Sequence, residues 1–246
     1  IEAEDRVATT QTTDKNALNI VIPVYPRASN HTDFDALRLH PDANVQLVKH
    51  ARDAGPCDLI ILPGSKAVLD DLAWLKAQGF ESLIKRHLRY GGKVLGICGG
   101  YQMLGETLSD PSQVESSQSE AKGLGLLAMD TTFYKDKTLR HVTGQATLFA
   151  AKVQAYEMHQ GQSEGQALAK PWLALTDEHG GQYSEGAQSD DGQVLGTYLH
   201  GLFDEPSMLN ALMQWAGKTH SSEFDYAEFK EQEFERLADV VKACLL

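Results

Sequence analysis

Cys98 is the residue of this chain best placed for nucleophilic chemistry. It follows the apolar run 94–97, which is typical of a buried strand, and precedes Gly99 and Gly100, where a segment with helical character begins. A sharp strand-to-helix turn of this kind exposes a nucleophile on strained backbone, which requires small neighbours. The helix N-terminus adds partial positive charge, which favours the thiolate. A buried structural cysteine is the alternative, but the flanking glycines favour a nucleophile.

His200 is the candidate base for this nucleophile. A cysteine nucleophile needs a base within hydrogen-bond reach, and that base can lie far away in the sequence. His200 ends the β-rich run 194–200 and is followed by Gly201. The carboxyl ends of strands are where an α/β sheet presents its catalytic groups. We therefore predict that His200 acts on Cys98, whereas an isolated histidine would be read as a surface residue.

The turn at Gly64 and Ser65 follows an apolar strand candidate, residues 59–62. Thiol attack on an amide creates a tetrahedral oxyanion that needs two preorganised N–H donors. The backbone N–H of Gly99, directly after the nucleophile, is one candidate, and that of Ser65 is the other. Turns of this composition are common, so the assignment depends on the presence of Cys98.

Short apolar runs alternate with helical patterns in the first half of the chain. This alternation predicts an α/β fold with a doubly wound, mainly parallel sheet flanked by helices. The expected strands are 19–24, 45–48, 59–62 and 94–97, and the expected helices are 69–78 and 80–90.

The second half of the chain has a different pattern. Residues 106–122 are rich in Ser, Gln and Glu, which indicates a mobile loop. Shorter, partly antiparallel strands are expected over 126–198, and a helix over 206–216. An amphipathic helix is expected over 222–246, because its apolar residues recur at helical spacing. These residues are Phe234, Leu237, Val241 and Leu245.

Composition is that of a globular enzyme domain. The 246 residues are 42% hydrophobic, which is enough for a substantial core. With 22 basic and 34 acidic residues, the net charge of −12 disfavours nucleic acid and anionic membranes as partners. Three cysteines do not form a disulfide framework, so a cytoplasmic location is the simplest. No His or Cys pair has the spacing of metal ligands, so no metal is expected.

Four segments together resemble the class I glutamine amidotransferases, and within them the branch that amidates corrin rings. The resemblance extends from about residue 18 to the C-terminus. The strand-to-helix turn 96–105 and the run 196–203 together are highly specific for this class, and residues 30–37 near the start of the matching region also fit it. The four segments are Gly-Ile-Cys-Gly-Gly-Tyr-Gln-Met-Leu-Gly, Leu-Pro-Gly-Ser-Lys, Tyr-Glu-Met-His and Gly-Thr-Tyr-Leu-His-Gly-Leu-Phe.

The resemblance implies Cys98 as nucleophile and His200 as general base of a glutaminase. Backbone N–H groups at Ser65 and Gly99 would form the oxyanion hole. Further residues are expected to contact the glutamine substrate: Gly64, Gly100, Gln102, Tyr156 and His159.

One feature departs from the pattern of the class. Many of its members follow the histidine with proline and then a glutamate that orients the ring, whereas Gly201 and Leu202 stand here. A Cys-His dyad is therefore implied, or a third group from elsewhere, for which Glu157 and Asp204 are candidates. Because an imidazole without an orienting partner samples unproductive tautomers, we expect the chain alone to be a poor glutaminase.

The resemblance also implies a second domain. Residues 1–17 are polar and aperiodic, as in a linker to an N-terminal synthetase domain, and no P-loop motif occurs in the chain. No cofactor is expected in this chain, and ATP and magnesium are expected in that synthetase domain. Ammonia from glutamine would amidate a corrinoid acceptor bound there. The glutaminase domain would span 18–216, followed by a helical extension, 217–246.

Several other functions remain open. Within the class, an a,c-diamide synthase or an amidotransferase of cell-wall precursors would carry similar motifs. Another Cys-His hydrolase on the same fold, such as a peptidase or a γ-glutamyl hydrolase, is a further possibility. In a non-catalytic module, the turn around Cys98 would only bind a ligand. Ammonia release from glutamine, peptide cleavage and labelling of Cys98 by a glutamine analogue would distinguish these functions.

Overall fold

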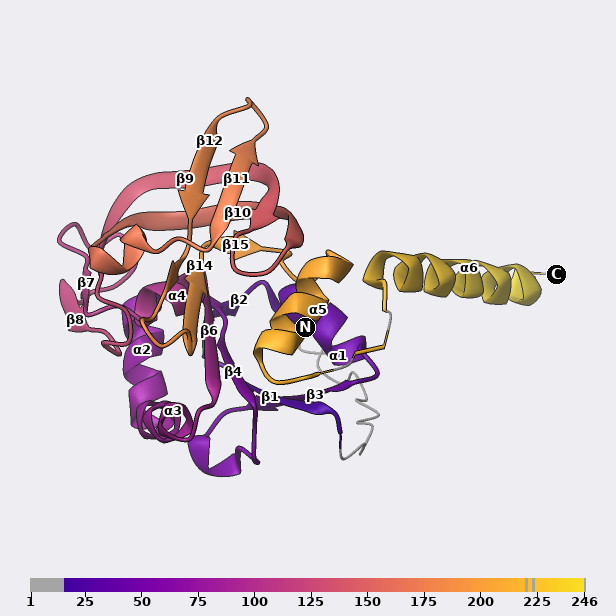
Figure 1. The fold of residues 1–246 in the computed structure, drawn as a ribbon, viewed down its shortest axis with the longest axis horizontal. Helices are drawn as coiled ribbons and strands as arrows, with labels where there is room; N and C mark the ends of the chain where they lie inside the picture. The colour runs from indigo at the N-terminus through magenta and orange to yellow at the C-terminus, as the bar shows by residue number, and fades with distance from the viewer. Residues whose placement is uncertain (1–15, 220, 223, 246) are drawn as a thin grey trace.

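A six-stranded sheet forms the centre of the computed structural model, which describes residues 16–219, 221–222 and 224–245 (Figure 1). Its strand order is β13-β14-β6-β4-β1-β3, and every pairing except β13–β14 is parallel. The predicted mainly parallel sheet is therefore confirmed. The strands are β1 (Leu18–Pro23), β3 (Ala43–Val48), β4 (Leu59–Leu62), β6 (Lys93–Ile97), β13 (Ala187–Gln188) and β14 (Val194–Thr197).

The central strands are apolar on both faces because helices cover both faces. Ile60 and Leu62 pack into one core with helices α2 (Val68–Ala77), α3 (Phe80–Arg89) and α4 (Gly99–Met103). Leu59 and Ile61 pack into a second core on the other face. That core contains residues of α1 (Asp35–Leu39) and α5 (Pro206–Trp215), which lie across the sheet from α2 and α3 (Figure 1).

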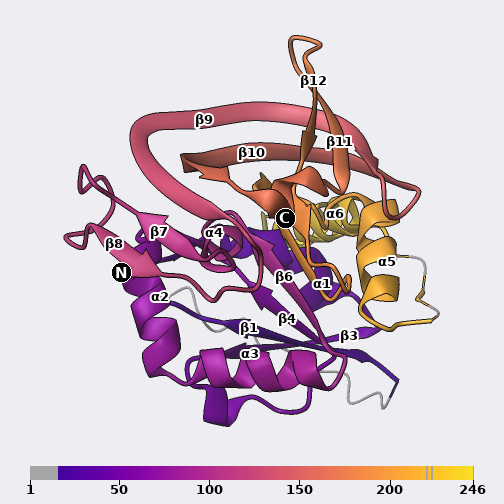
Figure 2. The same cartoon turned by 60° about the vertical axis from the view of Figure 1, so that its left-hand side comes forward.

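A second sheet of seven strands arches over the carboxyl ends of the central strands (Figure 2). Its two longest strands, β9 (Asp130–Ala146) and β10 (Ala151–Glu164), pair antiparallel along most of their length. The sequence predicts shorter strands here, but the antiparallel pairing is as expected. The remaining strands of this sheet are β7 (Thr107–Ser109), β8 (Glu120–Lys122), β11 (Leu173–Asp177), β12 (Gln182–Glu185) and β15 (Leu199–His200).

The expected mobile loop 106–122 has a defined structure. Strands β7 and β8 pair antiparallel, so the segment is a hairpin. Its tip is held by the buried carboxylate of Asp110, which accepts backbone N–H bonds from Val114, Glu115 and Ser116 at 2.7, 2.9 and 3.0 Å. The polar composition thus reflects a polar internal network, in which one aspartate satisfies three donors of the turn.

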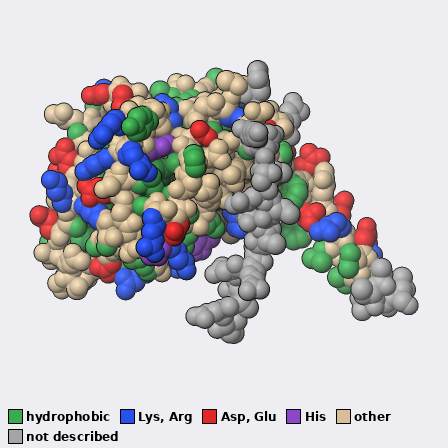
Figure 3. Space-filling view, turned by 90° about the horizontal axis from the view of Figure 1, so that it is seen from below, with side chains coloured by type: hydrophobic (Ala, Val, Ile, Leu, Met, Phe, Trp, Pro, Cys, Tyr) green, Lys and Arg blue, Asp and Glu red, His purple; other side chains and the backbone are tan. Residues whose placement is uncertain are grey.

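The final helix, α6 (Tyr226–Leu245), projects from the rest of the molecule (Figure 1). Apolar side chains of its later turns are exposed, Phe234 by 66% and Leu237 by 59%. Figure 3 shows hydrophobic side chains on the surface of this projecting helix. The predicted linker 1–17 lies outside the described residues except for its last two, and so do the side chains of Cys244 and Leu245. No helix in the described part of the chain is long and apolar enough to cross a bilayer.

Short connecting elements complete the described chain. Three of them, β2, β5 and η1, lie at or next to the site described below. The elements are β2 (Ala28–Ser29), β5 (Gly64–Ser65), and the 3₁₀ turns η1 (His31–Phe34), η2 (Ala51–Asp53) and η3 (Gln166–Ala169).

Candidate active site

Cys98 lies at the junction of β6 and α4, with φ 51° and ψ −110°. A positive φ is unusual for a residue with a side chain and marks local strain of the kind found at functional sites. The turn is tight because α4 approaches the sheet closely: a Cβ added to Gly100 would lie 2.1 Å from the carbonyl oxygen of Leu62 in β4. Packing against β4 therefore explains why residue 100 is glycine.

His200 lies in β15 next to β10, where it is paired with Tyr156. The Tyr156 ring stacks on the imidazole, with centroids 5.3 Å apart and an interplanar angle of 23°. Cys98 lies close enough to His200 to raise the pKa of its imidazole, and the Cys98 thiol donates to the carbonyl oxygen of Met158 at 3.4 Å. Two residues 102 positions apart in the sequence thus meet as the sequence predicts.

Asp33 holds the His200 ring through Nδ1. Asp33 Oδ2 lies 2.7 Å from His200 Nδ1, and both side chains are buried. The other carboxylate oxygen accepts the Gly201 N–H at 3.1 Å. An ionised carboxylate accepts hydrogen bonds and donates none, so this bond places a proton on Nδ1. The other ring nitrogen, Nε2, is then free to exchange a proton with the Cys98 thiol.

Asn30, at the start of the same turn, also contacts the imidazole. Its Nδ2 lies 2.8 Å from His200 Nδ1 and 3.2 Å from the Tyr156 hydroxyl. Its backbone has φ 54°, a left-handed conformation that asparagine tolerates. With the proton on Nδ1, the Asn30 amide would turn its oxygen toward both groups. The segment Asn30–Asp33 therefore contacts the imidazole through two side chains, those of Asn30 and Asp33.

The two carboxylates proposed from sequence do not bond to His200. Glu157 is on the opposite face of β10, where it bonds to Tyr183 and His159 and pairs with Arg140. Asp204 lies near Gly201, but its only hydrogen bond among the described residues is the backbone bond from its own N–H. Residues 30–37 fit the pattern of the class, but the sequence alone assigns Asp33 no role. An aspartate in a short polar segment before the apolar run of α1 was the available signal.

The environment of His200 favours its charged form. Burial alone would lower the pKa of the imidazole, but the bond to Asp33, the neighbouring Cys98 side chain and the negative charge of Asp33 raise it above its usual value. A protonated His200 beside Cys98 holds the proton that amide cleavage requires.

The predicted oxyanion donors lie side by side. The Ser65 nitrogen is 2.8 Å from the point where a Cβ on Gly99 would lie, so only glycine fits there. Strand β5 pairs antiparallel with β2, and the Lys66 N–H donates to the Arg27 carbonyl at 3.0 Å. Successive N–H groups of a strand point to opposite sides, so the Ser65 N–H points away from β2. Gly64 lies between Ser29 and His200.

The predicted substrate contacts fall into two groups. Tyr156 lies against His200, whereas His159, three residues further along β10, points to the opposite face. There His159 stacks on Tyr198 at 3.7 Å and lines a separate cavity of about 740 Å³. The structure therefore does not bring His159 and Tyr156 into one pocket. Gln102 is buried and donates to the Gln160 carbonyl at 2.8 Å, which ties α4 to β10.

Metal ligation receives no support from the described residues. No group of three or more His, Cys, Asp or Glu side chains in that part of the chain is arranged to hold an ion.

Comparison with known proteins identifies the family. The sequence pattern of the CobB/CobQ-like glutamine amidotransferase domain matches residues 19–208. A structure of PurLQS from Thermotoga maritima superposes with a TM-score of 0.58 at 16% identity, covering 81% of this chain and 99% of that chain. A candidate GMP synthase subunit from Thermoplasma acidophilum gives 0.54 at 13% identity, covering 89% and 99%. These two likenesses concern the fold alone. On the match over residues 19–208, the chain belongs to the CobB/CobQ-like glutamine amidotransferase domain family.

Proposed function

We propose that the chain hydrolyses the side-chain amide of glutamine and passes the ammonia to an amidation reaction. The observation that carries the proposal is the 2.7 Å bond from Asp33 to the ring of His200, the histidine that lies near Cys98 on its strained turn. Nucleophile, proton carrier and positioning carboxylate are all present in one chain. Family membership makes glutamine the substrate to test first.

The first half-reaction makes a thioester. His200 takes the proton of the Cys98 thiol on Nε2, and the resulting thiolate attacks the amide carbon of glutamine. The oxyanion that forms accepts N–H bonds from Ser65 and Gly99. The carbon–nitrogen bond then breaks. His200 gives the proton on Nε2 to the leaving nitrogen, which departs as ammonia.

The second half-reaction restores the enzyme. His200, now neutral, removes a proton from water, and the resulting hydroxide attacks the thioester carbon. The carbon–sulfur bond breaks, glutamate leaves, and the same two N–H groups stabilise the second oxyanion. Asp33 stays ionised throughout and keeps the Nδ1 proton in place. Tyr156, stacked on His200, is the best supported of the predicted substrate contacts.

For the acceptor, we propose a carboxylate of a corrin-ring precursor, as in cobyric acid synthase of cobalamin biosynthesis. The motifs around Cys98 and His200 resemble that branch, and the family match includes CobQ-like domains. Activation of the acceptor would require ATP and magnesium in an N-terminal synthetase domain of the same cytoplasmic polypeptide. An a,c-diamide synthase would share these features, so the acceptor has to be assayed directly.

The proposal is tested by two assays. Glutamate and ammonia formation from glutamine should be abolished by Cys98→Ser with the circular dichroism spectrum unchanged, and activity near the wild-type rate in that variant would refute the nucleophile. In the full-length enzyme with ATP, Cys98→Ser should still amidate cobyrinic acid a,c-diamide when ammonium chloride replaces glutamine. Failure of the wild-type enzyme to amidate that corrinoid from either nitrogen source would refute the proposed acceptor.

A further inference from the structure

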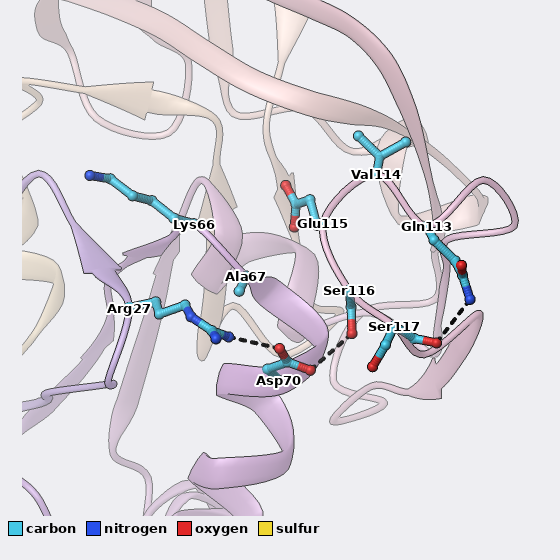
Figure 4. A pocket seen from close by; sticks show the side chains of 9 residues that line it. All are labelled: Arg27, Lys66, Ala67, Asp70, Gln113, Val114, Glu115, Ser116 and Ser117. Carbon is cyan, nitrogen blue, oxygen red and sulfur yellow. Dashed lines mark hydrogen bonds and ion pairs between the residues drawn. The ribbon is translucent and has the colours of Figure 1, made fainter.

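Glu185 differs from other carboxylates around the candidate site in where its bonds lead. Asp70, on the wall of an open cavity beside β5, accepts the Ser116 hydroxyl at 2.9 Å (Figure 4). That bond joins α2 to the segment between β7 and β8. Glu185, the last residue of β12, is buried and bonds instead to residues 197 and 198, directly before the segment that contains His200.

The Glu185 carboxylate accepts two bonds from the chain between β14 and β15. Its Oε2 atom accepts the Thr197 hydroxyl at 2.6 Å, and its Oε1 atom accepts the Tyr198 N–H at 2.8 Å. The Thr197 hydroxyl oxygen in turn accepts the Leu199 N–H at 3.1 Å. The chain passes here from the central sheet to the second sheet, where its buried N–H groups need acceptors outside a continuous strand. One carboxylate therefore fixes the path of the backbone that leads to His200.

Thr197 also holds the turn that carries the nucleophile. Its carbonyl oxygen accepts the Cys98 N–H at 2.8 Å, and it is paired with Ile97 in the parallel ladder of β14 and β6. The side chain of Thr197 thus bonds to Glu185 while its backbone bonds to Cys98. Because His200 lies further along the same short segment, the position of Thr197 affects both reacting side chains.

Glu185 is itself held in place by the chain that follows it. Gly186 has φ 80°, which favours glycine, and a Cβ there would lie 2.5 Å from Trp172 Nε1. The Trp172 indole donates to the Gly196 carbonyl in β14 at 2.9 Å. Close packing among these three residues leaves Glu185 little freedom to move away from Thr197.

Building on the proposed glutaminase activity, we propose that Glu185 is a positioning residue that sets the separation of Cys98 and His200 through Thr197. Its action is indirect, since its bonds go to Thr197 and Tyr198 and not to the reacting atoms. Proton transfer between the thiol and the imidazole depends steeply on their separation, so a small displacement of Thr197 would slow the reaction. A carboxylate suits this task because both of its oxygens accept, whereas glutamine would offer one acceptor oxygen to two donors.

The surroundings of Glu185 make its charge depend on pH near neutrality. Burial, and then the charge of Glu157 in β10, raise the pKa of Glu185 to about 7, although three hydrogen bonds to the carboxylate oppose the shift. Below about pH 7 the protonated carboxyl keeps one acceptor oxygen, for which the Thr197 hydroxyl and the Tyr198 N–H compete. Among the other ionisable groups that line the same cavity are Tyr101 of α4, Arg140 of β9, His159 of β10, Tyr183 of β12 and Tyr198.

The first experiment compares Glu185→Gln with the wild type across pH. At pH 8 we expect kcat for glutamine to fall roughly 10-fold, as for loss of a hydrogen bond to a charged group, and KM to change less than about twofold. The ratio of the two kcat values should approach 1 below about pH 6, where wild-type Glu185 is itself protonated. Titration of Cys98 and His200 occurs in both proteins and largely cancels in this ratio. An equal loss at every pH would mean that Glu185 only supports the fold, and an unchanged kcat at pH 8 would overturn the proposal.

A second pair of variants tests the same link at Thr197. Thr197→Val removes the hydroxyl with little change in volume and should lower kcat at pH 8 by a similar factor, whereas Thr197→Ser keeps the hydroxyl and should stay within about threefold of wild type. Combining Thr197→Val with Glu185→Gln should add little to either single loss, because both remove one interaction. Full additivity would contradict the link. Glu178→Gln is the matched control on the β11–β12 turn, where the carboxylate accepts the His141 N–H at 2.7 Å.

The rate at which iodoacetamide labels Cys98 gives a measurement that does not depend on turnover. At pH 8, Glu185→Gln should slow labelling of Cys98 relative to Cys57 in the same protein, because a displaced His200 stabilises the thiolate less. Equal rates in variant and wild type would overturn the proposal. A wild-type protein that releases no glutamate would contradict the proposed function, and slower labelling of Cys98 in Glu185→Gln would then still support the positioning role.

Discussion

Replacing Asp33 by asparagine should reverse the hydrogen-bond polarity of His200. The Gly201 N–H needs an acceptor, so the asparagine oxygen should take the position of Asp33 Oδ1 and its amide nitrogen should face His200 Nδ1. That nitrogen is a donor, so Nδ1 becomes an acceptor and the ring proton moves to Nε2. Neutral His200 then donates to Cys98 and cannot take a proton from water during thioester hydrolysis.

The size of the effect follows from the geometry. Loss of a buried 2.7 Å bond to a carboxylate would cost about 1.5–3 kcal/mol, which is roughly 10- to 150-fold in rate. Fixing the wrong tautomer adds to this, so we expect kcat for glutamine to fall on the order of 10²–10⁴-fold. KM should change little, because Asp33 contacts the ring and not the substrate.

The assay is glutamate release by Asp33→Asn across pH, with thermal melting to verify the fold. The negative charge of Asp33 helps to raise the pKa of His200, so its removal should lower that pKa and move the basic limb of the pH profile to lower pH. Asp33→Glu should restore part of the rate. Asp35→Asn is the matched control, because Asp35 bonds to Arg38 in the same segment. A kcat for Asp33→Asn within about threefold of wild type, on an unchanged pH profile, would refute the positioning role.

Two further predictions concern the turn and the second described thiol. Gly100→Ala should lower the free energy of unfolding in urea by about 1–3 kcal/mol, because its Cβ would lie 2.1 Å from the Leu62 carbonyl oxygen; an unchanged denaturation midpoint would show that α4 can move away from β4. Burial and then the charge of Asp58 raise the pKa of Cys57 to about 11, so iodoacetamide at pH 8 should label Cys98 well before Cys57 in peptide mass maps, and equal labelling would argue against this environment.

The central sheet could be predicted because its pattern is local. In β4, Leu59–Leu62, all four side chains are apolar because each face of the strand is covered by helices, and the predicted and observed bounds agree. The long strands β9 and β10 were harder to predict. Residues 134–137 of β9 are exposed and three of them are charged, so the sequence there looks like a turn although the backbone continues in the strand. Because one side of that sheet faces solvent, this part of β9 lacks the continuous apolar pattern by which a buried strand is predicted.

In the candidate site, too, residues with a local sequence signal could be predicted and residues without one could not. Cys98 could be identified because its turn constrains the adjacent residues, and His200 because it ends a strand. Asp33 could not, since 167 positions separate it from His200 and only the tertiary fold brings the two together. His159 is the converse case. Tyr156 and His159 look equivalent as polar residues of one strand, but an odd spacing places them on opposite faces.

Asp33 also changes what can be expected of the isolated chain. The sequence suggests a poor glutaminase because no carboxylate follows His200 at the usual place. In the structure a carboxylate of the same chain holds Nδ1, so orientation of the imidazole gives no reason for a partner to be needed. Any gain in activity on binding a synthetase domain would have to come from elsewhere.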